Sequence, residues 1–279
     1  MGWLFRHKKQ NSAQEPASQA YCRCAGLQGI GSRPEQQDAF AFGSLDKTPL
    51  HDGVFAVVAD GMGGMEGGAY AGQTAVACLR DAFLETNGNV PVPELLEAAM
   101  RNADEVIYHG LLGMGGSTAV AAAVVQKQLW FAGVGDSFLY LRRNEELFRL
   151  NRAQNVAHDL YLESIRRGKV SRTAAEASSE PAALSQFLGI GGLTDIDISY
   201  LPFPLQDGDV LLLCSDGVAG VLTEEKLLSV LNGIDPQEMC NALEHRICDE
   251  RHPYQDNYTA IVLQCGVNRK AINGHESIK

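Results

Sequence analysis

The chain has 279 residues, of which 45% are hydrophobic and 20% are charged, and this balance is typical of a globular protein rather than a disordered or fibrous one. A chain of this length buries enough surface to hold a core without a metal or a disulfide staple. The formal net charge of −11 repels phosphate backbones, so we expect no nucleic-acid partner, whereas the same charge favours cation binding.

The cysteine pattern indicates a reducing compartment. The seven cysteines are odd in number and scattered along the chain, which favours free thiols over a disulfide framework. No apolar run reaches the length of a membrane-spanning helix, and the apolar stretch at residues 3–5 is too short for the core of a signal peptide. We therefore expect a cytoplasmic protein without a transmembrane segment.

The two ends of the chain differ from its middle. Residues 1–20 join a small basic cluster to a Gln, Ser, Ala and Pro stretch without hydrophobic periodicity, so they are predicted to form a flexible tail. Residues 267–279 are predicted to form a second tail. The intervening residues 21–266 are predicted to form a single domain.

Within that domain, short apolar runs separated by Gly and Asp predict β-strands. These runs are residues 40–42, 54–59, 118–125, 129–134, 138–141, 210–214 and 259–263. Short turns at residues 126–128 and 143–144 join neighbouring runs and indicate antiparallel pairing.

Helices are predicted in groups before and after these strands. The clearest spans residues 94–109, with Leu95, Ala99, Val106 and Ile107 on one face. Two more helices are predicted after Thr223 and after residues 235–236, where the sequences match N-terminal capping patterns. The pattern favours an α+β layered fold over a doubly wound parallel sheet.

Residues 151–188 differ from both flanking segments. They are charged, rich in Ala and Ser, and lack an apolar strand. We interpret them as a surface excursion of the domain and not as a second domain.

Three apolar runs end in an aspartate followed by a small residue, at Asp60, Asp136 and Asp216, and Asp256 precedes another apolar run. Taken alone, each Asp-Gly pair is a common turn signal. Four carboxylates at the ends of buried strands are, however, expected to meet at a sheet rim, where their mutual repulsion requires a cation. Oxygen donors without matching Cys or His favour Mg²⁺ or Mn²⁺ over Zn²⁺.

Six ordered blocks of the sequence together resemble the metal-dependent protein phosphatases, the PPM or type-2C serine/threonine phosphatase family. They are residues 32–38 (SRPEQQD), 57–64 (VVADGMGG), 116–119 (GSTA), 133–137 (GVGDS), 212–218 (LLCSDGV) and 256–259 (DNYT). The resemblance extends from about residue 21 to 266. Met62 stands where many eukaryotic members have His, so the chain is similar to the bacterial branch.

The resemblance implies a four-layer α-β-β-α sandwich, with two antiparallel sheets flanked by helix pairs. It also implies a centre of two Mn²⁺ or Mg²⁺ ions and a flap at about residues 151–189. By this resemblance, Asp60 would bridge the two ions. Asp216 and Asp256 would complete the ligands of one ion, and the Gly61 carbonyl would bind the other, with Asp38 acting through bound water. Arg33 would bind the phosphate. Asp136 is expected to hold a third, weaker ion together with Asp216.

The function implied by the resemblance is hydrolysis of phosphoserine and phosphothreonine by a water held between two metals, with Arg33, Asp38 and Asp60 as catalytic residues. We expect a phosphoprotein substrate, an opposing serine/threonine kinase and a monomeric enzyme. Two alternatives stay open: a catalytically silent phosphatase-like sensor or binding module, and a small-molecule phosphohydrolase with the same chemistry.

The sequence departs from the family pattern at three places. Phe138 replaces an Arg, the flap lacks a clean Thr-x-Asp-His segment, and Gln37 replaces a Glu next to Asp38. A neutral amide accepts weaker hydrogen bonds than a carboxylate, so Gln37 is expected to loosen the hold on the second metal.

Overall fold

The structure, a computed structural model, describes residues 21–63, 65–169, 171, 173 and 183–266. The predicted tails at residues 1–20 and 267–279 lie outside the described residues, as does part of the predicted flap. No helix in these described ranges is both long enough and apolar enough to cross a membrane.

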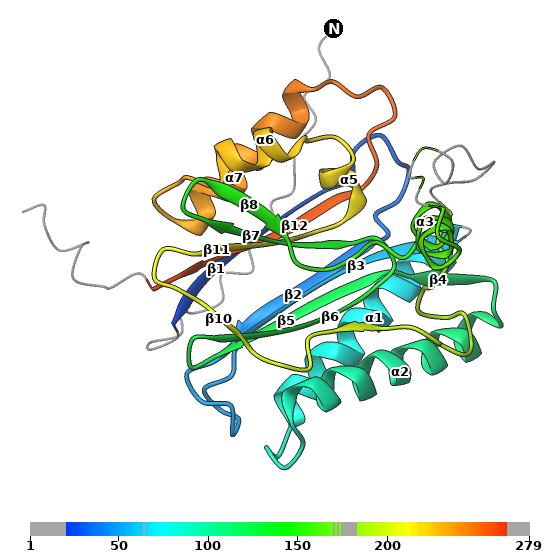
Figure 1. The fold of residues 1–279 in the computed structure, drawn as a ribbon, viewed down its shortest axis with the longest axis horizontal. Coiled ribbons are helices and arrows are strands. Elements are labelled where there is room, and N and C mark those ends of the chain that lie inside the picture. The colour runs from blue at the N-terminus through cyan, green and yellow to red at the C-terminus, as the bar shows by residue number, and fades with distance from the viewer. Residues whose placement is uncertain (1–20, 64, 170, 172, 174–182, 267–279) are drawn as a thin grey trace, which may run out of the picture.

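Two antiparallel sheets form the centre of the domain (Figure 1). The first sheet has the order β1 (Cys22–Gly29), β12 (Tyr258–Cys265), β11 (Val210–Cys214), β7 (Phe138–Arg143) and β8 (Glu146–Arg149). The second has the order β10 (Phe203–Pro204), β6 (Gln128–Val134), β5 (Ala119–Val125), β3 (Val54–Gly63) and β2 (Asp38–Ser44). Two short strands join it, β4 (Gly115–Ser117) on β3 and β9 (Asp197–Ile198) on β6.

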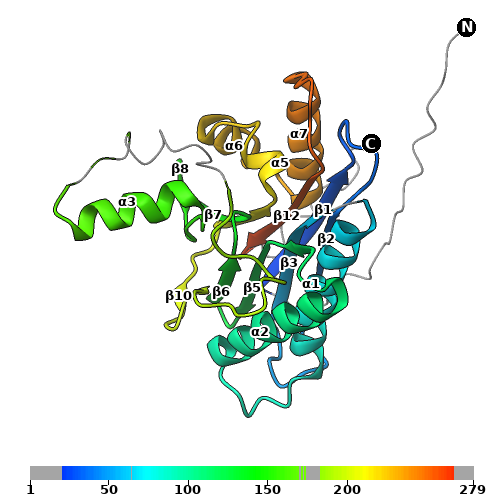
Figure 2. The same cartoon turned by 90° about the vertical axis from the view of Figure 1, so that its right-hand side faces the viewer.

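Helices cover the outer faces of both sheets, which confirms the predicted four-layer α-β-β-α sandwich. The second sheet is covered by α1 (Met65–Glu85) and α2 (Val92–Leu111), and the first by α5 (Asp216–Ala219), α6 (Glu224–Val230) and α7 (Pro236–Asp249). Helix α3 (Val156–Arg166) belongs to neither helical layer and projects to one side of the sandwich (Figure 2).

The alternation of side chains along the strands builds three layers of core. In β3, Val54, Ala56 and Val58 face the first sheet, whereas Phe55 and Val57 face α1 and α2. This alternation follows from the two-residue repeat of a strand, and it explains why buried strands are continuous apolar runs.

The predicted helix at residues 94–109 is α2, and it is slightly longer than predicted. Pro93 lies in its first turn, where its missing N–H costs no helical hydrogen bond, and the buried face of the helix includes Leu96 and Met100. Val106 was predicted to share the buried face, and this was wrong: Val106 is 40% exposed, because the face that packs on the core runs through Ala103 and Ile107.

The capping predictions for the two C-terminal helices are confirmed. The Thr223 side chain accepts a hydrogen bond from the Lys226 N–H at the start of α6, and Asp235 accepts one from the Glu238 N–H at the start of α7. Helix α1 was not predicted from the sequence, because the glycines at residues 61, 63, 64, 67 and 68 are unfavourable in helices and obscure its beginning.

Candidate active site

Asp38 and Asp60 are Cα partners in the antiparallel register of β2 and β3. The sequence pattern placed Asp60 at the end of a strand. In the structure Asp60 lies within β3, because the strand continues to Gly63. Beyond Asp60, β3 leaves β5 and pairs with β4, with Gly61 opposite Ser117. The two carboxylates therefore lie where β3 changes partners.

Asp38 is only 5% exposed and is held on one side by Ser215, whose hydroxyl donates a 2.8 Å hydrogen bond to Asp38 Oδ2. Asp38 Oδ1 is buried and accepts no hydrogen bond from the described residues. Burial raises the pKa of the Asp38 carboxyl to about 6, and the nearby charges of Asp216 and Asp256 act in the same direction.

Asp216 follows β11 directly and begins α5. Its Oδ1 is also buried without a partner among the described residues. Burial raises the pKa of Asp216, and burial together with the charges of Asp38 and Asp216 raises the pKa of Asp60 well above its ordinary value. Asp60 and Asp216 therefore lie close enough for each carboxyl to affect the pKa of the other.

Asp136 follows β6 in the turn to β7 and faces the same group of carboxyls. Burial raises its pKa to about 6, and the second cause is the charge of Asp216. The structure thus brings Asp38, Asp60, Asp136 and Asp216 together from four separate segments of the chain.

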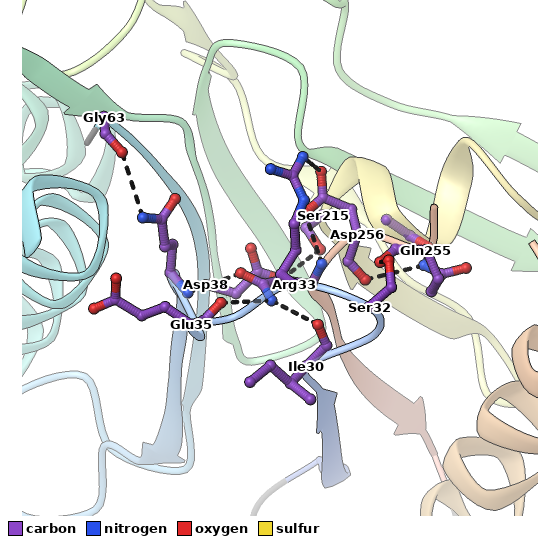
Figure 3. A network of polar contacts seen from close by, with 12 residues as sticks. Ile30, Ser32, Arg33, Glu35, Asp38, Gly63, Ser215, Gln255 and Asp256 are labelled. Atoms are coloured by element: carbon purple, nitrogen blue, oxygen red, sulfur yellow. Dashed lines mark hydrogen bonds and ion pairs between the residues drawn. The ribbon is translucent and has the colours of Figure 1, made fainter. Parts of the chain in front are cut away.

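Arg33 and Asp256 form an ion pair at 2.5 Å at the open side of this group (Figure 3). The two side chains are 55% and 36% exposed, so this guanidinium lies at the surface of the site. The backbone N–H of Ser32 and its hydroxyl both donate to the Gln255 carbonyl, which ties the Arg33 loop to the segment that carries Asp256.

Gly61 is required by close packing. Its N–H donates a 3.2 Å hydrogen bond to the Gln37 carbonyl, and a Cβ at this position would lie 2.0 Å from the Gly68 carbonyl oxygen. Only glycine fits this contact between β3 and the first turns of α1.

Asn257 positions the loop that carries Arg33, and the sequence analysis missed this role. Its Nδ2 donates to the carbonyls of Ile30 and Glu35 at 2.9 and 3.0 Å, and its Oδ1 accepts a hydrogen bond from the Gln37 N–H at 2.8 Å. The only signal in the sequence was its position directly after Asp256.

A second positioning residue, Asp104, was also missed. This α2 side chain is 3% exposed and accepts hydrogen bonds from four backbone N–H groups at 2.8–3.3 Å, those of residues 189, 191, 192 and 193. Just before this loop, Leu188 exchanges two backbone hydrogen bonds with Ser117, whose hydroxyl donates to the Asp60 carbonyl. Asp104 therefore connects the end of the predicted flap to the strand of Asp60.

The beginning of the predicted flap is capped in a regular way. The Asn155 side chain accepts a hydrogen bond from the His158 N–H, and α3 buries none of its side chains. Residues 170, 172 and 174–182 of the predicted flap lie outside the described residues.

The Gln37 side chain lies beside the first turns of α1. It lies against Gly68, where a Cβ would be 2.5 Å from the amide carbon, and its Nε2 donates a 3.4 Å hydrogen bond to the Gly63 carbonyl. The amide thus supports the turn from β3 into α1.

The cluster of four carboxyls, from Asp38, Asp60, Asp136 and Asp216, has the chemistry of a divalent cation site. Asp38 Oδ1 and Asp216 Oδ1 are buried without hydrogen-bond partners among the described residues, and burial raises the pKa of all four carboxyls, which is an environment that favours a bound cation. Within the described ranges, no three His, Cys, Asp or Glu side chains already have the spacing of a coordination sphere. All-oxygen donors suit Mg²⁺ or Mn²⁺.

Comparison with known proteins identifies the family. The sequence profile described as protein phosphatase 2C matches residues 26–250. The serine/threonine phosphatase stp of Listeria innocua is 34% identical over 199 residues, which are 68% of this chain and 74% of that protein.

Solved structures show the same fold. The PPM Ser-Thr phosphatase MsPP of Mycobacterium smegmatis, in complex with cacodylate, superposes with a TM-score of 0.70 at 26% identity, covering 88% of this chain and all of that one (100%). The catalytic domain of the serine/threonine protein phosphatase PstP, in complex with two manganese ions, gives a TM-score of 0.70 at 23% identity, with 87% and 97% of the chains covered. The chain belongs to the protein phosphatase 2C family of metal-dependent serine/threonine protein phosphatases.

Proposed function

We propose that this chain hydrolyses phosphoserine and phosphothreonine in proteins, and that it does so with two Mn²⁺ or Mg²⁺ ions bound at the cluster of carboxyls described above. The observation that carries this proposal is the buried cluster of Asp38, Asp60 and Asp216, in which Asp38 Oδ1 and Asp216 Oδ1 have no hydrogen-bond partner among the described residues. Divalent ions in such a group lower the pKa of a water and neutralise charge on phosphoryl oxygens.

The ligand roles follow from position. Asp60 lies between Asp38 and Asp216, so it suits a bridging role, while Asp216 and Asp256 suit one ion and the Gly61 carbonyl suits the other. Asp38 retains one free oxygen because Ser215 occupies only Oδ2, and that oxygen suits contact through bound water. Asp136 and Asp216 suit a third, weaker ion.

Arg33 suits phosphate binding because its guanidinium is exposed at the surface of the site and already pairs with an anionic group, the Asp256 carboxylate. Its planar fork pairs with two oxygens of a phosphate monoester as readily as with the Asp256 carboxylate. If Asp256 held a cation, the guanidinium would be available for a phosphate. Asn257 would hold the Arg33 loop in place through its hydrogen bonds to the Ile30 and Glu35 carbonyls.

We further propose that residues 21–266 act as a single catalytic domain, with residues 151–189 as a flap beside the site. A monomeric protein that works in the cytoplasm against a serine/threonine kinase is the simplest setting for this activity. A silent binding module is disfavoured because all seven predicted site residues are present in the sequence.

The test is phosphate release from a phosphothreonine peptide by the full chain, with a phosphotyrosine peptide of the same sequence as the control. We expect hydrolysis of the phosphothreonine peptide only with added Mn²⁺ or Mg²⁺, and its loss when a chelator is added. Undiminished hydrolysis in excess chelator would refute the metal mechanism. Equal rates on both peptides would refute the proposed substrate class.

A further inference from the structure

Two cysteines meet at the end of the first sheet that is remote from Arg33. Cys22 is the first residue of β1 and Cys265 is the last residue of β12, and they are Cα partners in the antiparallel register. Their sulfur atoms are 2.6 Å apart, and the residues are 4% and 0% exposed. Both side chains belong to the core between the two sheets.

The backbone hydrogen bonds show which type of pair this is. The Gly266 N–H donates to the carbonyl of its partner Tyr21, and the Cys265 N–H donates to Asp209 on the opposite side of β12. Cys22 and Cys265 therefore form a non-hydrogen-bonded pair, in which Cα atoms are about 4.5 Å apart and side chains are closest. That spacing lies within the range of about 4.4–6.8 Å that disulfides span.

The other cysteines do not compete for this contact. Cys24 lies on the same face of β1 as Cys22, but its partner on β12 is Leu263. Cys214 and Cys240 belong to the core under α6 and α7, and Cys78 packs against the core under α1 and α2. Cys248 is exposed on α7.

We propose that Cys22 and Cys265 are a redox modification site, at which a low-molecular-weight disulfide oxidises the two thiols to a cross-strand disulfide. The Cys22 thiolate attacks the small disulfide, forming a mixed disulfide and releasing one small thiolate. The Cys265 thiolate then attacks the Cys22 sulfur and releases the second small thiolate. Two protein thiols lose two electrons and two protons, and one small disulfide is reduced to two small thiols.

The strand end provides access to the reagent. Cys22 begins the edge strand of the sheet, and strand ends open more readily than the rest of a sheet. The mutual hydrogen bond with Cys265 and burial both raise the pKa of the Cys22 thiol, so the reaction is expected to be slow at neutral pH and faster at mildly alkaline pH.

The disulfide would join the first and last strands of the domain and close a loop of nearly the whole chain. Long loops lose the most unfolded-state entropy when they are closed, so oxidation is expected to raise the melting temperature by roughly 5–10 °C. Arg33 follows β1 and Asp256 precedes β12, so both lie at the other end of these strands from the two cysteines. Catalysis should therefore not depend on the oxidation state of the cysteines.

The experiment treats the full chain with oxidised glutathione at mildly alkaline pH and compares it with the reduced protein. Thiols are titrated in denaturant, linked peptides are identified by mass spectrometry under non-reducing conditions, and thermal unfolding is followed with and without reductant. We expect the loss of two thiols, a Cys22–Cys265 peptide, and a rise in melting temperature that reductant reverses.

Three variants control the interpretation. Cys22→Ala and Cys265→Ala should each abolish the linked peptide and the rise in melting temperature, whereas Cys24→Ala should retain both. Seven titratable thiols after prolonged treatment, or a linkage between other cysteines, would overturn the proposal. Failure of the phosphatase assay would not affect this result, because the readouts do not use the active site.

Discussion

Asp38 and Asp60 are directly opposed across β2 and β3, so the register of one strand pair places two carboxylates side by side in a buried position. Opposed like charges destabilise a sheet, and burial adds to the cost. The Ser215 hydroxyl compensates only one oxygen of Asp38. The site therefore gains stability when a cation enters, and this relationship leads to the first two predictions.

The cluster of buried carboxyls should make the metal-free protein less stable at neutral pH than at acidic pH. The pKa of Asp38 is about 6 in the folded protein, above its ordinary value of 3.8, so its contribution to stability is fully present below about pH 4 and is lost as the pH rises through about 6. A shift of this size corresponds to roughly 2–3 kcal/mol. Thermal unfolding in chelator, from about pH 4 to about pH 7, should show this loss, and Asp38→Asn should reduce it. Identical pH profiles for the parent and the variant would contradict the assignment.

Asp60→Asn and Asp216→Asn should each lower turnover at least about 100-fold, because each removes a charged ligand oxygen from the proposed metal centre. In chelator, both variants should melt at or above the temperature of the parent, since each removes one charge from a crowded buried group. Asp46→Asn, at an exposed loop position, is the matched control. A variant that is inactive and also strongly destabilised in chelator would indicate a structural role instead.

Asp104→Ala should destabilise the fold by roughly 2–4 kcal/mol, because four buried or partly buried N–H groups lose their acceptor. Asp104→Asn retains one acceptor oxygen and should fall between the parent and the Ala variant. Urea unfolding measures these differences, with the exposed neighbour Glu105→Ala as control.

The same Asp104 variants also test the connection from this loop through Leu188 and Ser117 to Asp60. If that connection positions the site, KM for a phosphopeptide should rise at temperatures where the protein remains folded, and Asp104→Asn should partly restore it. An unchanged KM in a folded Asp104→Ala protein would confine Asp104 to a structural role.

Gln37→Glu should not tighten the metal site, contrary to the expectation from sequence. The Gln37 amide donates to the Gly63 carbonyl, and a carboxylate at that position would lose this bond and repel the carbonyl oxygen. We expect the Mn²⁺ concentration for half-maximal activity to stay the same or to rise. A fall of about 10- to 100-fold would show that the side chain turns toward metal-bound water, as the sequence comparison suggested.

The sequence by itself determined the layered α+β class and the identity of the candidate ligands. Strand β11 coincides with the predicted run at residues 210–214, because a buried strand is a short apolar segment whose ends are marked by polar residues. The aspartates that follow such runs were recognisable for the same reason. The caps at Thr223 and Asp235 were readable because a capping interaction spans only three residues.

Tertiary structure alone decided which of these groups meet. Arg33 and Asp256 are separated by 223 positions in the sequence, and Gly189 and Asp104 by 85, so no local pattern links them. The opposition of Asp38 to Asp60 depends on strand register, and a slip of one residue would place these side chains on opposite faces. The exposure of Val106 and the contact of Cys22 with Cys265 were likewise settled by packing. Local residue patterns specify elements because their interactions span a few positions, whereas the site is assembled from contacts whose partners are chosen by the packing of whole sheets and helices.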